Sequence, residues 1–93
     1  MIEETPSTHF DHYRMAKSHE KNGRFKEALE SYSKALEISD DYAHAWFYKG
    51  KLLYKMEKYK DCIDCAERAL KLAPNWADHI NKLLSDARSR TEA

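Results

Sequence analysis

The 93 residues are enough for one small domain with a modest core. Hydrophobic residues make up 42% of the chain and charged residues 34%, with two glycines and two prolines, a mixture that favours helix and excludes collagen-like, disordered and all-β chains. Sixteen basic and sixteen acidic side chains cancel, so net charge provides no attraction to nucleic acid or to an anionic membrane.

The first half of the chain predicts a tail and two helices. We expect residues 1–8 to form a flexible tail, which lacks the basic start and apolar core of a secretion signal. Thr8 and Asp11 are typical of a helix N-terminus, and the first helix should run over about residues 9–21 and stop at Gly23. The second, over about 24–39, is strongly amphipathic. Its apolar residues recur at three- and four-residue steps: Phe25, Ala28, Leu29, Tyr32, Ala35 and Leu36.

Three further helices are expected in the second half. Asp40 and Asp41 offer an N-terminal cap for a third helix over about residues 42–56. A fourth covers about 58–73 and is ended by Pro74. A fifth runs from about Asn75 to Arg88. Its single apolar stripe is typical of a helix that caps one end of a stack: Ile80, Leu83, Leu84 and Ala87.

The first two helix pairs are copies of one pattern. A shift of 34 residues aligns 9–42 with 43–76, and matches Ala16 with Gly50, Ala35 with Ala69 and many others. This period and these residues closely resemble the tetratricopeptide repeat. In the second copy the family's signature residues are Trp46, Gly50, Tyr59, Ala69 and Pro74, whereas the first copy has His12, Ala16 and Asp40 in place of the Trp, Gly and Pro.

The resemblance implies an all-α fold, a right-handed superhelix of antiparallel helix pairs with about five helices. Its segments would be a tail (1–8), two repeats (9–42 and 43–76) and a capping helix with a tail (77–93). It also implies a protein–protein interaction module in which the first helix of each pair lines a concave groove. Carried over residue by residue, the groove would contain Phe10, Tyr13, Arg14, Lys17, Lys21, His44, Phe47, Tyr48, Lys51, Tyr54, Lys55, Asn81 and Lys82.

These groove residues are basic and aromatic, whereas the second helices hold most of the acidic residues, such as Glu30 and Asp64. Such a surface suits an extended acidic peptide, because lysines meet carboxylates and rings cover apolar side chains. The alternative is an ordinary row of solvated lysines. The carboxylate clamp of co-chaperone members of the family is not matched, since its positions hold residues such as Tyr13, Tyr48 and Asp78.

Cys62 and Cys65 form a C-x-x-C pair that is open to three interpretations. Packing in a helix seam, half of a zinc site shared across a dimer, and a redox pair each fit the spacing, although no second pair of cysteines completes a zinc site. The five histidines are spread over several helices, and no catalytic motif is present, so we expect neither an enzyme nor a cofactor.

Two functions follow as hypotheses. The first is a cytoplasmic adaptor or scaffold that binds a peptide or partner protein, with no role for nucleic acid or a membrane. The second is an assembly subunit that docks or forms a homodimer through helix faces, since two repeats build only a small core.

Overall fold

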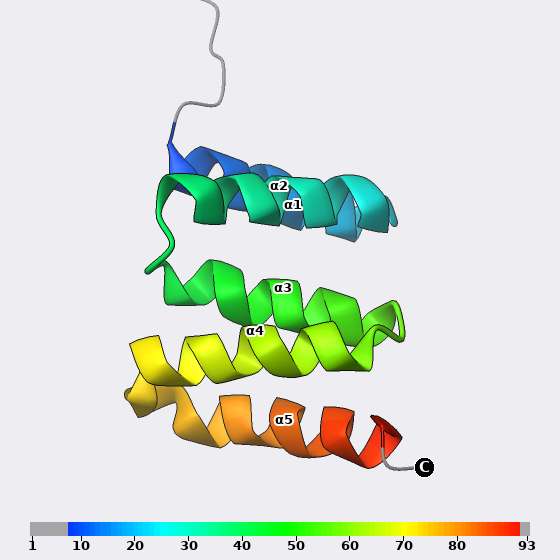
Figure 1. The fold of residues 1–93 in the computed structure, drawn as a ribbon. Helices are drawn as coiled ribbons and strands as arrows, with labels where there is room; N and C mark the ends of the chain where they lie inside the picture. The colour runs from blue at the N-terminus through cyan, green and yellow to red at the C-terminus, as the bar shows by residue number, and fades with distance from the viewer. Residues whose placement is uncertain (1–7, 92–93) are drawn as a thin grey trace, which may run out of the picture.

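The computed structural model describes residues 8–91, which form five α-helices and one short 3₁₀ turn and contain no strand. The helices are α1 (His9–Lys21), α2 (Phe25–Ile38), α3 (Ala43–Lys55), α4 (Tyr59–Leu72) and α5 (Ala77–Thr91), and the turn η1 (Pro74–Trp76) precedes α5. They stack in chain order, with α1 against α2, α3 against α4, and α5 against α4 (Figure 1). The expectation of an all-α stack of helix pairs is confirmed. The expected tail lies outside the described residues, apart from Thr8.

Capping of the helix N-termini is as predicted at α1 but not at α3. The Asp11 backbone N–H donates to Thr8 Oγ1 at 3.1 Å, which satisfies one of the free N–H groups of the first turn. At α3 the N-cap residue is Tyr42, which makes no side-chain cap. The prediction of a cap from Asp40 or Asp41 is therefore wrong. The Asp41 carboxylate instead accepts a hydrogen bond from the Ser39 hydroxyl at 2.7 Å. The Asp40 backbone carbonyl accepts one from Trp46 Nε1, also at 2.7 Å.

The turns within the two pairs have the same backbone but different residues. Gly23 ends the first helix of its pair with φ 77°, and Glu57 occupies the equivalent position with φ 62°. Each turn is closed by the same two hydrogen bonds. In one of them, the N–H of the residue after the turn donates to a carbonyl of the preceding helix: Arg24 N–H to His19 O and Lys58 N–H to Leu53 O, both at 2.8 Å. This is the helix ending that favours glycine.

Small residues allow the helices to approach closely. Ala28, Ala35, Ala66 and Ala69 are completely buried in the core. A Cβ atom added to Gly50 would lie 3.4 Å from the Cys65 Cβ, which leaves room for a methyl group and no more. The seam of the second pair is thus filled at close approach, as the repeat spacing predicts.

The fifth helix begins after a 3₁₀ turn at Pro74 and ends at Thr91 rather than near Arg88. It buries Ile80, Leu84 and Ala87 against α4 and leaves Leu83 half-buried. Within residues 8–91, no helix has the length and apolar character needed to cross a membrane.

Candidate functional site: the α1–α3–α5 face

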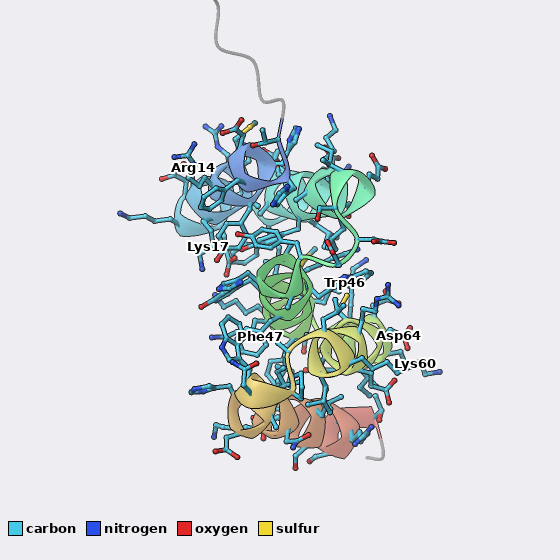
Figure 2. The ribbon with its side chains drawn as sticks, turned by 90° about the vertical axis from the view of Figure 1, so that its left-hand side faces the viewer. Arg14, Lys17, Trp46, Phe47, Lys60 and Asp64 are labelled. Carbon is cyan, nitrogen blue, oxygen red and sulfur yellow. The ribbon has the colours of Figure 1, made fainter. Side chains whose placement is uncertain are left out.

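The first helices of the pairs present one side of the molecule, which we call the α1–α3–α5 face. Figure 2 shows Arg14, Lys17 and Phe47 on this side, with Lys60 and Asp64 of α4 on the opposite side. The basic side chains of the face come from both first helices, with Arg14, Lys17 and Lys21 on α1 and Lys51 and Lys55 on α3, and α3 contains no acidic residue.

Tyr13 is the centre of an aromatic cluster on this face. Its ring centroid lies 5.3 Å from that of Tyr42, 6.0 Å from Tyr48 and 6.3 Å from His44. Burial raises the pKa of Tyr13 to about 12, and the neighbouring Tyr48 and Tyr42 add to the rise. Tyr13 is therefore an uncharged wedge between the two repeats rather than an exposed contact.

The cluster continues to the start of α5. His44 is exposed, stacks on Tyr42 at 5.5 Å and meets the edge of Trp76 at 4.4 Å. Phe47 also meets Trp76, at 5.8 Å. These edge-on contacts are the favoured geometry for aromatic rings, so the cluster forms a rigid ledge along the N-terminal ends of α3 and α5.

Two lysines lie over one ring next to this ledge. The Lys17 ammonium is 3.7 Å from the Tyr48 ring centroid, and the Lys51 ammonium is 5.6 Å from the same centroid. Burial lowers the pKa of Lys17; Glu20 opposes this effect, while Lys51 and Lys55 add to it. Two cations share one aromatic support, and a nearby carboxylate opposes their mutual repulsion.

The compensating charge is Glu20, which the sequence analysis did not select. Its carboxylate accepts from Lys55 Nζ and from the Tyr32 hydroxyl, each at 2.8 Å. Burial alone would raise the pKa of Glu20, but these two hydrogen bonds bring it below its ordinary value. A signal was available, because the 34-residue shift places Glu20 on Tyr54, which was selected.

Two hollows flank α3 on this face. One, of about 530 Å³, lies between α1 and α3 and is lined by charged and polar side chains: Lys17, Ser18, Glu20, Lys21 and Lys55. The other, of about 350 Å³, lies between α3 and α5. Its lining mixes aromatic, apolar and charged side chains: Phe47, Lys51, Tyr54, Lys55, His79, Lys82, Leu83 and Asp86. His79, Leu83 and Asp86 were not selected from the sequence.

Some selected residues are placed differently from the rest. Phe47 is only 8% exposed and belongs to the core around Ile80 and Leu84, so it forms a floor rather than a free ring. Asn81 lies on the α4 side, beside Glu67 and Lys71. The α5 residues that line the hollow next to α3 follow three- and four-residue steps, and Asn81 does not fall on that side of the helix.

At the outer end of α1, Phe10 is 55% exposed and Arg14 lies over its ring at 5.5 Å. Arg14 is also paired with Asp11 at 2.9 Å. Both residues stand beyond the Tyr13 cluster, toward the edge of the face. The continuous part of the site therefore runs from Lys17 across Tyr48 and Lys51 to Lys82.

Comparison with known proteins agrees with this architecture. A family model described as TPR repeat matches residues 16–57, and one described as tetratricopeptide repeat matches residues 43–76. The chain belongs to the tetratricopeptide repeat family. Such domains are generally protein–protein interaction modules and are typically non-catalytic.

Two solved structures of a tetratricopeptide repeat domain protein from Salinibacter ruber are similar to the chain. The crystal structure is 24% identical, with a TM-score of 0.70, over 91% of this chain and 97% of that one. The solution structure is 26% identical, with a TM-score of 0.70, over 92% of this chain and 85% of that one. No curated protein matches the chain.

The cysteine pair lies within the helix seam of the second tetratricopeptide repeat. Cys62 is fully buried, Cys65 is 4% exposed, and both pack with Leu53 and Ala87. Burial raises the pKa of each thiol to about 11. Both are free thiols, and these surroundings favour packing. Among residues 8–91, no three His, Cys, Asp or Glu side chains are grouped so that they could hold a metal ion.

Proposed function

We propose that this tetratricopeptide repeat domain is an adaptor that binds an acidic segment of a partner protein, in extended form, on the α1–α3–α5 face. The observation that carries the proposal is the placement of Lys17 and Lys51 over the single ring of Tyr48. Two neighbouring ammonium groups are suited to two carboxylates of one chain.

Lys17 and Lys51 are better candidates than the other lysines of the face. Lys55 is already engaged, because its ammonium donates to Glu20 at 2.8 Å. Lys17 interacts with the same carboxylate without a hydrogen bond, and its pKa is lowered first by burial and then by the neighbouring Lys51 and Lys55. A bound carboxylate would favour the charged form of Lys17, because it would offset both the burial of the ammonium group and the repulsion from Lys51 and Lys55.

The rings support binding in a different way. Tyr42 and His44 are held by edge-on and stacked contacts, so a peptide that lies on them orders few additional side chains. A preformed surface lowers the entropic cost of association. Carboxylates over the lysines and apolar groups over the rings together describe an acidic segment with some apolar content.

A pair of double variants tests the proposal. Lys17→Gln with Lys51→Gln removes both cations from the face, and neutral glutamine avoids a new repulsion with Glu20. Lys26→Gln with Lys60→Gln is the matched control, because these exposed lysines are also 34 residues apart and lie on α2 and α4. The probe is a fluorescein-labelled ten-residue peptide of serine and glycine with one leucine and two glutamates.

Fluorescence anisotropy should show the native protein binding this peptide more weakly as salt rises, since exposed charges are screened. The front-face double variant should bind about 10-fold more weakly, and the back-face control should be unchanged. Equal effects of the two double variants, or no effect of either, would rule out the α1–α3–α5 face as the peptide site.

A second candidate, an assembly role, has one observation in its favour. Phe10 is 55% exposed and Ile38 is 50% exposed, and both lie at the same end of the first helix pair. A second copy that covered this end would bury both side chains. Sedimentation of the native protein over a concentration series, without peptide, would show dimers if this role applies and monomers if it does not.

A further inference from the structure

The hollow between α3 and α5 differs from the one between α1 and α3 in having an apolar floor. Phe47, Tyr54 and Leu83 form that floor, and all three are buried or half-buried. Lys51 and Lys82 are exposed and stand among the lining residues. With a volume of about 350 Å³, it is at the small end of ligand pockets, which suits a single side chain.

On the basis of the proposed function, we infer that this hollow is an anchor pocket for one aliphatic side chain of the bound acidic segment. The pocket and the lysine pair are continuous, because Lys51 belongs to both. Its ammonium lies 5.6 Å from the Phe47 ring centroid on the pocket floor and 5.6 Å from the Tyr48 ring that supports Lys17. A ligand that fills the pocket is therefore already next to a cation.

This spacing sets a sequence rule for the ligand. In an extended strand, residues i and i+2 point to the same side and are about 6.6 Å apart. An aliphatic residue on Phe47 then places the side chain two positions away near the Lys51 ammonium. The favoured ligand has an aliphatic residue and an acidic residue two positions apart, with a further acidic residue within reach of Lys17.

The α5 side of the pocket decides on which side the acidic residues lie. Asp86 lines the pocket together with Lys82, one helical turn away, so this wall presents charges of both signs. A carboxylate placed toward α5 would approach Asp86, whereas one placed toward α1 meets Lys51 and Lys17. The acidic residues of the ligand therefore lie on the α1 side of its aliphatic anchor, and the segment crosses α3.

A series of peptides on the native protein is the first test. The parent is the ten-residue serine and glycine peptide with leucine two positions before the first of two glutamates, which are themselves two positions apart so that both point to the same side. One comparison peptide has alanine in place of leucine, and another has the same composition with leucine six positions from the nearest glutamate. Both should bind about 10-fold more weakly than the parent, which is the effect of losing a few methylene groups from an apolar pocket.

Variants that fill the pocket are the second test. His79→Trp places a large ring among the lining residues, and Asp78→Trp is the matched control, because Asp78 is also exposed on α5 but does not line the pocket. The roughly 10-fold advantage of the leucine peptide over the alanine peptide should disappear in His79→Trp and persist in Asp78→Trp. Lys82→Trp is a second filling variant if the first does not fold.

The outcomes separate this inference from the proposed function. If all three peptides bind equally and still weaken in the Lys17→Gln, Lys51→Gln variant, the pocket is not an anchor and the acidic-peptide function stands. If the leucine advantage survives both filling variants, the anchor lies elsewhere and the inference is overturned. If no peptide responds to the loss of the two lysines, the proposed function itself fails.

Discussion

The two helix pairs hold contrasting residues on equivalent sides of their first helices. In α3, Ala45, Leu52 and Leu53 are buried, and α3 packs against α2 of the preceding pair. The residues 34 positions earlier in α1 are Asp11, Ser18 and His19, none of which is fully buried. One repeat pattern thus serves two environments. Ala45 and Leu52 differ from their counterparts because they face the preceding pair, whereas Leu53 packs in the seam with α4.

Trp46 and His12 show the contrast most sharply. Trp46 packs against three core clusters, including the one formed by Ala35, Leu36 and Ala45, and its Nε1 donates to the Asp40 carbonyl. His12 stands at the equivalent position, and its Nδ1 is buried without a hydrogen-bond partner among the described residues. Trp46 thus packs between the two pairs, whereas no described helix precedes α1 for His12 to pack against.

The largest effect is therefore expected for Trp46→Ala, which should lower the free energy of unfolding by about 3 kcal/mol, the usual range for removing a large aromatic side chain from a core. His12→Ala should cost less than about 1 kcal/mol, because the removed ring includes an unsatisfied buried polar atom. Urea denaturation of both variants gives the comparison. Similar losses in the two would contradict the assignment of Trp46 as the joint between pairs.

The first repeat, by contrast, has a polar tie whose residues are not repeated at the equivalent positions of the second. Glu20 joins Tyr32 within the first pair and Lys55 across to α3, while the residues equivalent to Glu20 and Tyr32 are Tyr54 and Ala66. The Glu20 side chain is 13% exposed, so the charge-assisted bonds are shielded from water. Glu20→Gln should destabilise the native protein by about 1.5 kcal/mol at pH 7.

The effect of Glu20→Gln should depend on pH in one direction. Because the pKa of Glu20 is lower in the folded protein than in the unfolded chain, its contribution is present above the unfolded value of about 4.3 and is lost as pH falls through the folded value. Thermal unfolding of the two proteins should differ at pH 7 and converge in acid. Glu27→Gln, at an exposed position on α2, is the control. A difference that persists below pH 3 would show that Glu20 acts through shape rather than charge.

The helix pattern was predictable to within about one residue for α1 to α4, because apolar side chains at three- and four-residue steps mark the covered side of each helix. Two details at the ends were not. The Asp40 and Asp41 cap was misjudged because Ser39 competes for the Asp41 carboxylate. The Glu57 turn was not predicted because its residue type favours no left-handed backbone, and only the repeat position reveals it.

The candidate site was predictable as a surface but not as a set of contacts. Repeat alignment placed Lys17, Tyr48 and Lys51 on one face, which the structure brings together. It could not tell that Lys55 is taken by Glu20, or that Phe47 lies beneath α5. Those contacts depend on how close a neighbouring helix comes to each side chain. The residue pattern within one helix contains no information about the distance between helices.

The turn that ends α1 and its counterpart after α3 provide the smallest comparison and the cleanest one. Gly23 and Glu57 have nearly the same positive φ, and the hydrogen bonds that close the two turns are equivalent. A left-handed backbone costs a residue with a Cβ atom about 1 kcal/mol or more relative to glycine. A Cβ added to Gly23 would meet no atom within 4 Å, so any effect of Gly23→Ala comes from the backbone alone.

Reciprocal substitutions at these turns should have opposite signs. Gly23→Ala should lower the free energy of unfolding by about 1 kcal/mol, and Glu57→Gly should raise it by somewhat less, because glycine also gives the unfolded chain more freedom. Each change corresponds to a shift in Tm of about 4–8 °C per kcal/mol for a domain of this size. Calorimetry of the two single variants and the double variant measures both. If Glu57→Gly were destabilising, the Glu57 side chain would have to stabilise the turn by more than its backbone costs, and the two turns would not be equivalent in energy.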